Sequence, residues 1–211
     1  MSMIWHFYHI YADGNYQPAV EEHILAMQQH ELLSHLDGFY LGLVGTPENR
    51  QAAVDLINSH GVYPQIRAAA DDGWEHVTLE ALRRHCHVHD GNVLYAHTKS
   101  AYNATDINIA WRKSMCYYNV VQWRQNLLAL QDHDTSGCHF IDDRAQHGGL
   151  GHRFYGGTYW WARTAHIRRL PDLIYHSRWC AEWWIGERFD DWKHYDTNPG
   201  WPDFPLFRTE W

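Results

Sequence analysis

Three short stretches of the sequence combine residue types that could do chemistry. The stretch "VLYAHTKSA" (residues 93–101) ends an apolar run in His97, Thr98 and Lys99. A lysine in that place is a mobile point charge suited to phosphate oxygens, although a plain surface lysine after a strand would look the same. A diphosphate group is the ligand that this stretch favours.

The stretches "YGGTYWWA" (155–162) and "AEWWIG" (181–186) set glycines and one acid among aromatic residues. A glycine pair within a strand marks a bulge or a backbone that a ligand approaches closely. Burial among aromatic rings raises the pKa of a carboxylate such as Glu182 and suits it to acid–base catalysis. Ordinary core tryptophans, and a pairing of Glu182 with an arginine, are the structural alternatives.

Histidines suggest a third chemistry, because "RRHCHVHDG" (83–91) alternates His85, His87 and His89. In an extended strand the three imidazoles would share one face and could bind zinc. The preceding apolar spacing predicts a helix end instead, where the rings fan apart. A zinc enzyme is therefore the weaker hypothesis.

Alternating strands and helices are expected to position these residues. Apolar runs predict strands at residues 3–11, 39–45, 64–70 and 92–97, the first of them buried on both faces. Helical spacing between them predicts helices over residues 18–36, 46–61 and 74–91. Crossovers of this length favour a largely parallel sheet with helices on both faces and ligands at the carboxyl ends of the strands.

The second half has a different pattern. Residues 111–131 are expected to form one long helix, with Met115, Tyr118, Val121 and Leu128 on a shared face. A glycine-rich stretch, a short strand and a helix over 163–170 follow. We expect a single domain over 1–211, with a nucleotide-binding half (1–102), a half for the sugar and acceptor (103–189) and an irregular tail (190–211).

Composition limits the function classes. With 17 Lys plus Arg against 25 Asp plus Glu, the net charge is −8, so no broad basic face for a nucleic-acid backbone is expected. The four cysteines lie far apart and form no CxxC pair, as is usual for reduced thiols in the cytoplasm. The first residues lack a signal-peptide pattern, and no apolar run is long enough for a membrane anchor.

The order of these motifs resembles a family. "LYAHTKS", then Trp111-Arg112 at a helix start, then "YGGTYWWAR" with "IRRLP", then "AEWWIG", is similar to small GT-A type glycosyltransferase-like proteins over roughly residues 4–187. The resemblance implies a Rossmann-like GT-A fold with an aromatic-rich C-terminal elaboration. It also implies transfer of a sugar from a nucleotide-sugar donor to a hydroxyl acceptor.

The resemblance assigns candidate roles to particular residues. Glu182 would be the catalytic carboxylate near the acceptor. The donor would be held by Tyr11, Asp13, His97, Thr98 and Lys99, with Lys99 and His97 neutralising the diphosphate as its charge grows. The pocket for sugar and acceptor would be shaped by Arg112, His152, Gly156, Gly157, Thr158, Trp160 and Trp161.

Two departures from the family pattern matter. This chain has Ser100 where the family has glycine, and "GGTYWWA" where "SGNFWWA" is usual. His97 and Lys99 also occupy the places of the Asp-x-Asp that holds Mn²⁺ or Mg²⁺ in most GT-A enzymes. No residue is assigned to a metal, and Asp71, Asp72 and Asp106 are the carboxylates to revisit if a metal is required.

The sequence leaves the acceptor open among a glycan, a protein, a small metabolite and a modified DNA base. A non-catalytic module that binds a sugar or a nucleotide on the same fold is the main alternative to a transferase, because a fold does not fix a function.

Overall fold

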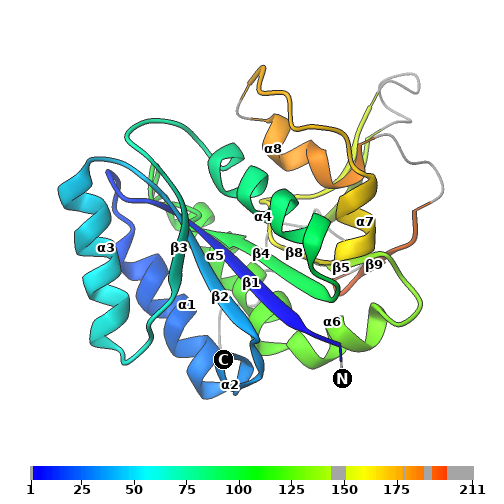
Figure 1. The fold of residues 1–211 in the computed structure, drawn as a ribbon, viewed down its shortest axis with the longest axis horizontal. Coiled ribbons are helices and arrows are strands. Elements are labelled where there is room, and N and C mark those ends of the chain that lie inside the picture. Colours follow the sequence, from blue (N-terminus) through cyan, green and yellow to red (C-terminus); the bar gives the residue numbers. More distant parts are fainter. Residues whose placement is uncertain (1, 144–150, 178, 188–191, 199–211) are drawn as a thin grey trace.

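The computed structural model describes residues 2–143, 151–177, 179–187 and 192–198. Within them, seven strands form one sheet in the order β3-β2-β1-β4-β8-β5-β9, and β6 and β7 form a separate pair. Helices cover both faces of the sheet (Figure 1). The predicted α/β fold, with a mostly parallel sheet flanked by helices, is confirmed.

The first half alternates strands and helices as the sequence predicts. Its elements are β1 (Ile4–Tyr11), α1 (Gln17–Gln29), α2 (Leu32–His35), β2 (Gly38–Val44), α3 (Pro47–Ser59), β3 (Gln65–Ala70), α4 (His76–Val88) and β4 (Asn92–His97). The four strands pair in parallel, and β1 and β4 are neighbours with His9 opposite His97. The two strands therefore end at the same edge of the sheet.

The helix predicted over residues 18–36 is interrupted. Helix α1 ends at Gln29, and Glu31 takes a left-handed backbone conformation (φ 63°) before α2 begins. That conformation ends the α-helical hydrogen bonding of α1, but Leu32 and Leu36 still pack against the apolar cluster that α1 joins. Leu25 of α1 is 42% exposed.

The second half adds antiparallel strands to the same sheet. Its elements are α5 (Asp106–Cys116), the π-helix η1 (Tyr117–Val121), α6 (Trp123–Ala129), β5 (Thr135–Gly137), β6 (Phe140–Asp142), β7 (Arg153–Tyr155), β8 (Trp160–Arg163), α7 (Thr164–Arg169), α8 (Cys180–Trp183), the 3-10 helix η2 (Trp184–Gly186) and β9 (His194–Asp196). Strand β8 runs antiparallel to β4 and β5. Of the tail predicted over 190–211, residues 192–198 are described and include β9; the rest lies outside the described residues.

The single helix predicted over residues 111–131 is wrong in two respects. It begins earlier, because the Thr105 hydroxyl caps α5 by accepting a hydrogen bond from the Asn108 N–H. It is also broken by η1, where the Asn119 carbonyl accepts a hydrogen bond from the Trp161 indole. A π-turn inserts an extra residue and rotates the following face. Leu128 consequently points outward and is 63% exposed.

Two apolar clusters hold the layers together, one on each face of the sheet. Helices α1, α3 and α5 pack on one face, through residues such as Ile24, Ile57 and Met115. Helices α4 and α7 pack on the other, through Leu79 and Ile167, and lie in front of the sheet in Figure 1. Strand β1 is buried on both faces, as predicted.

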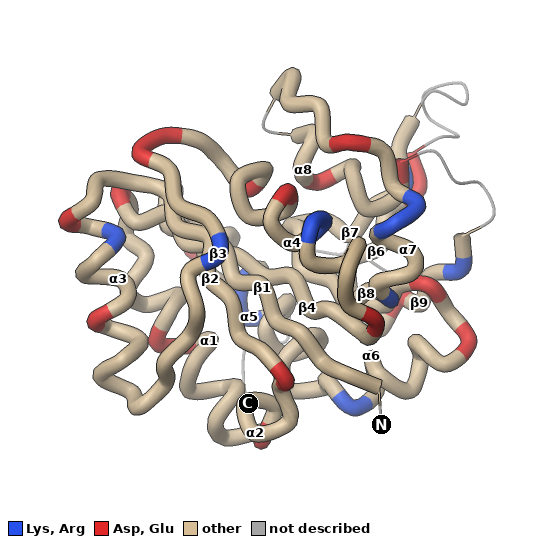
Figure 2. The backbone as a smooth tube through the Cα atoms, in the orientation of Figure 1, with Lys and Arg blue, Asp and Glu red and all other residues tan. Residues whose placement is uncertain are grey.

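Charged residues are dispersed over the part of the chain that the structure describes. Figure 2 shows acidic and basic positions interspersed along the backbone, with no continuous basic stripe over the coloured residues. The described helices include none with the length and apolar character that a bilayer crossing requires. All four cysteines are free thiols, three of them buried.

Candidate functional site

A pocket of about 400 Å³ lies where β1 and β4 end, the edge at which the sequence analysis expects a ligand. Five of its lining residues carry titratable acid or base groups, five are aromatic and the others are polar: His9, Glu75, His97, Lys99 and Glu182; Tyr11, Trp74, Tyr102, Trp111 and Trp179; Thr98, Ser100, Asn103, Asn108 and Thr158. Its lining includes Trp74 and Glu75, just before α4, and Glu182 on the short helix α8. A mixed apolar and polar lining of this kind is typical of small-molecule sites.

The turn after β4 is anchored to β1. The Thr98 hydroxyl accepts a hydrogen bond from the Tyr11 N–H (3.0 Å), and the Thr98 N–H donates to the His9 carbonyl (2.9 Å). Ser100 has a φ of 73°, a left-handed conformation that glycine adopts most easily. A glycine at position 100 would adopt this backbone conformation at a lower energetic cost than serine does.

Lys99 lies at the mouth of the pocket, where its ammonium nitrogen is 4.1 Å from the centre of the Trp111 ring. A cation–π contact of this kind orients a flexible side chain without removing its charge. The predicted donor-binding residues His97, Thr98 and Lys99 are thus brought together in one lining, together with Tyr11.

Arg112 supports this turn from behind the pocket and does not line it. Its guanidinium pairs with the Glu22 carboxylate through two nitrogens (3.2 and 3.1 Å) and also donates to the Ser100 hydroxyl. The arginine side chain is 6% exposed and the glutamate side chain 14%. The role assigned to Arg112 as a pocket residue is therefore corrected: it positions the turn.

A second turn, Gly157-Thr158, closes the other side of the pocket. Both residues have positive φ, 89° and 59°. A Cβ at Gly157 would lie 2.5 Å from the Met115 sulfur, so only glycine fits without displacement. The Gly157 N–H donates to Glu182 Oε1 (2.7 Å), and the Gly157 carbonyl accepts from His97 Nε2 (2.8 Å).

His97 faces Glu75 with its other nitrogen, at 3.2 Å between Nδ1 and Oε1. A carbonyl oxygen only accepts, so Nε2 carries the proton and Nδ1 of the neutral ring presents a lone pair. Burial lowers the pKa of His97 to about 3, which keeps the ring neutral. Burial also raises the pKa of Glu75 to about 7, an effect that Lys99 and Thr158 partly offset. Near neutral pH Glu75 is thus close to the midpoint of its titration, and its protonated form can donate a hydrogen bond to His97 Nδ1.

The two tryptophans expected to line the sugar pocket belong to the core instead. Trp160 and Trp161 are fully buried and lie in opposite apolar clusters, because adjacent residues of a strand point to opposite faces of the sheet. Neither ring has an exposed face for a sugar. Trp160 and Trp161 are ordinary core tryptophans, the alternative to a sugar-binding role that the sequence analysis left open.

Three other predicted residues lie outside the pocket lining. His152 stacks on Trp183 with ring centres 4.1 Å apart, and Gly156 donates its N–H to the His139 carbonyl. Asp13 accepts hydrogen bonds from the Asn49 amide and the Thr46 N–H, both at 2.9 Å, and these lower its pKa. These contacts hold the start of α3, and Asp13 lies outside the pocket lining.

Sequence reasoning predicted Tyr11 at this site but missed Trp74 and Tyr102, the aromatic residues beside it. The rings of Tyr11 and Trp74 are nearly parallel (10°) with centres 6.3 Å apart, and Tyr102 meets both edge-on at 6.2 and 6.1 Å. It also missed Glu75, which follows Trp74 on the connection between β3 and α4. Trp74 and Glu75 could have been found from their position in the sequence, because they follow a predicted parallel strand and ligands bind at the carboxyl ends of such strands.

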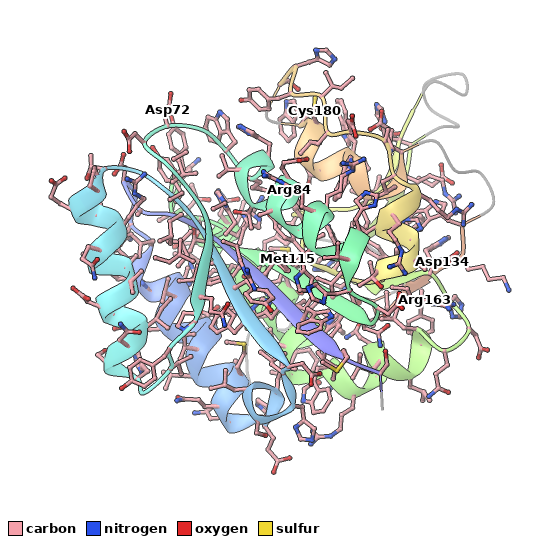
Figure 3. All side chains as sticks on the ribbon, viewed as in Figure 1. Asp72, Arg84, Met115, Asp134, Arg163 and Cys180 are labelled. Atoms are coloured by element: carbon pink, nitrogen blue, oxygen red, sulfur yellow. The ribbon has the colours of Figure 1, made fainter. Side chains whose placement is uncertain are left out.

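The described residues do not fit a divalent metal. They contain no group of three or more His, Cys, Asp or Glu side chains placed to hold one. Asp71 pairs with Arg50 (2.8 Å), and Asp72, labelled on the β3–α4 connection in Figure 3, accepts from its neighbour Gly73. Asp106 lies in the first turn of α5.

The histidines of "RRHCHVHDG" do not form a metal site either. His85 is buried and packs against the rings of Trp5 and His89 at 4.7 and 4.2 Å. His87 is exposed on the same helix end. The rings of His85 and His89 therefore form part of an aromatic packing contact.

Two solved structures share this fold. One is a 4-diphosphocytidyl-2C-methyl-D-erythritol synthase from Anaerococcus prevotii, with a TM-score of 0.54, 8% identity, and coverage of 99% of this chain and 93% of the other. The second is a putative nucleotide-diphospho-sugar transferase from Desulfovibrio desulfuricans, with a TM-score of 0.50, 13% identity, and coverage of 94% and 80%. At such identities the likeness concerns the fold alone.

Sequence comparison identifies a family whose description names no activity. No curated protein matches the chain. Residues 7–183 match the family described as "Domain of unknown function (DUF8361)", and the chain belongs to that family.

Proposed function

We propose that this protein is a glycosyltransferase that moves a sugar from a nucleotide-sugar donor to a hydroxyl acceptor. The observation that carries the proposal is the pocket at the ends of β1 and β4, where Lys99, two carboxylates and a group of aromatic rings converge. The shared fold with a protein described as a putative nucleotide-diphospho-sugar transferase supports the same class.

Each part of the donor has a chemically matched partner in the pocket. The aromatic group of Tyr11, Trp74 and Tyr102 offers ring faces and edges to a nucleobase. Lys99 supplies a positive charge for the diphosphate, whose negative charge grows as the glycosidic bond breaks. Thr158 and Glu182 line the pocket near the Gly157 turn, which leaves that side for the sugar and the acceptor.

A thermal-shift panel tests the proposal, with UDP, UDP-glucose, GDP-mannose and ADP-glucose measured with and without Mn²⁺. A ligand at 100 times its dissociation constant stabilises the fold by about 2.7 kcal/mol, which raises the Tm by several degrees. We expect one nucleotide sugar to do so without metal, and to be hydrolysed slowly with water as acceptor.

The variant Lys99→Met tests whether the nucleotide binds in this pocket. We expect it to weaken binding of the stabilising nucleotide by roughly tenfold, while Lys193→Met, on an exposed residue beside β9, leaves binding unchanged. Binding without any turnover would favour a non-catalytic nucleotide-binding module. Absence of stabilisation by every nucleotide in the panel would refute the proposed function.

A further inference from the structure

Glu75 and Glu182 are the two carboxylates of the pocket lining, and a series of polar contacts joins them. It runs from Glu75 Oε1 to His97 Nδ1, from His97 Nε2 to the Gly157 carbonyl, and from the Gly157 N–H to Glu182 Oε1. We propose, on the basis of the transferase function above, that Glu75 is the base that takes the proton of the acceptor hydroxyl.

The two carboxylates make different contacts. Glu182 accepts a hydrogen bond from the Gly157 N–H, which ties it to that turn. Oε1 of Glu75 faces a lone pair on His97 Nδ1, an arrangement that becomes a hydrogen bond only when a proton arrives. Its other oxygen, Oε2, is buried, and the Thr158 side chain is the polar group that interacts with the carboxylate.

Glu75 remains accessible to a ligand even though it is desolvated. Its side chain is 21% exposed and lines the pocket together with Lys99. A base works best when its pKa is close to the working pH, and the pKa of Glu75 is raised to about 7. Glu182, the catalytic carboxylate predicted from the sequence, also lines the pocket, where it accepts a hydrogen bond from the Gly157 N–H.

The transfer step balances with these groups alone. The acceptor oxygen forms a bond to the anomeric carbon while the bond from that carbon to the diphosphate oxygen breaks. The electron pair of the broken bond stays on the diphosphate, near Lys99, and the hydroxyl proton moves to the Glu75 carboxylate. The protonated acid then donates to His97 Nδ1, which stabilises the product state.

The groups around Glu75 give a defined pH dependence. The titratable and polar groups around Glu75 are His97 and Tyr95 from β4, Lys99 and Thr158 from the two turns, and His9 from β1 next to His97. Burial raises the pKa of Tyr95 well above its usual value, so it stays neutral near pH 7. Burial lowers the pKa of both His9 and His97 to about 3, so neither changes charge near pH 7. Because the base must be ionised, kcat/KM for hydrolysis should rise with pH and level off above about 7.

The experiment compares wild type, Glu75→Gln and Glu182→Gln in hydrolysis of the panel's nucleotide sugars, with water as acceptor, from pH 5.5 to 8.5. The amide that Glu75→Gln introduces can still donate a hydrogen bond to His97 Nδ1, so a purely positional role predicts nearly normal activity. We expect Glu75→Gln to lower kcat at least 100-fold and to abolish the rise with pH, with UDP affinity within about twofold of wild type. Glu182→Gln should lower the rate and keep that rise.

The outcomes separate the inference from the proposed function. If wild type hydrolyses the donor and Glu75→Gln keeps its rate and pH profile, the inference is overturned and the transferase stands. If wild type neither binds nor hydrolyses any nucleotide sugar, both fail. Glu75→Asp, which keeps a carboxylate, is the second variant: it should retain a rise with pH at a reduced rate, and a flat profile would contradict the assignment.

Discussion

Two turns meet at the pocket, and they are held by different kinds of contact. The turn after β4 bends through Ser100 (φ 73°), and the turn after β7 bends through Gly157 and Thr158 (φ 89° and 59°). The first is fixed from behind by the buried Arg112–Glu22 pair, whereas the second is fixed by His97 and Glu182, which line the pocket themselves.

Substitutions at the contacts of the two turns should therefore affect different measurable properties. Contacts that hold the first turn lie in the protein interior, so their loss should appear mainly in the free energy of unfolding. Contacts that hold the second turn face the ligand, so their loss should appear in catalysis as well. Substitutions on the two sides can therefore be compared directly.

The largest stability loss is expected for Arg112→Ala. Removing the guanidinium leaves the nearly buried Glu22 carboxylate without its partner and the Ser100 hydroxyl without its donor, which should cost about 3–5 kcal/mol in urea unfolding. Arg124→Ala breaks an exposed pair with Glu31 and should cost less than about 1 kcal/mol. Equal losses in the two variants would contradict a supporting role for Arg112.

Gly157→Ala should be next, with a loss of about 2–4 kcal/mol. The new methyl group combines a left-handed backbone with a contact 2.5 Å from the Met115 sulfur. Gly61→Ala is a matched control, since Gly61 also has positive φ (75°) but open space around its Cβ position, and it should cost about 1 kcal/mol. The test also requires hydrolysis rates, which should fall for Gly157→Ala beyond the fraction unfolded.

The sequence predicted the first half of the fold well because its signals are local. Strand β1 is a continuous apolar run, and α3 carries both a Thr46 cap and a proline at its first position. Strands and helices of this kind follow from spacing and capping alone. The position of the pocket followed as well, since parallel strands present their carboxyl ends together.

The second half was predicted less well because its geometry depends on distant contacts. Within the π-turn η1, the Asn119 carbonyl accepts a hydrogen bond from the indole N–H of Trp161, a residue 42 positions away in the sequence. The sequence also shows two adjacent tryptophans without showing that both faces of β8 are buried. The only signal for Glu75 was its position after a parallel strand, because its partner His97 lies at the end of β4, far away in the sequence.

Glu75 links the two turns through His97, and it should make stability depend on pH. Its pKa is raised to about 7 in the folded protein, so its contribution is complete below the ordinary value of 4.5 and is lost as pH rises through 7. Glu75→Gln removes this loss and should be about 1–3 kcal/mol more stable relative to wild type at pH 8 than at pH 5. Urea unfolding of both proteins at the two pH values measures the difference. Glu80→Gln, on a side chain of α4 that is 40% exposed, should show no such change with pH.

The smallest effect is expected for Thr98→Val, in the first turn. Valine keeps the shape of the side chain but cannot accept the hydrogen bond from the Tyr11 N–H, which should cost about 1–2 kcal/mol in urea unfolding. Thr98→Ser keeps the acceptor oxygen and should recover most of that loss. Because this contact holds the backbone at the strand ends and does not involve Glu75, the rise of hydrolysis with pH should be unchanged in both variants. A shifted pH profile in Thr98→Val would mean that the two turns are coupled, and the separation between a stabilising turn and a catalytic turn would then be wrong.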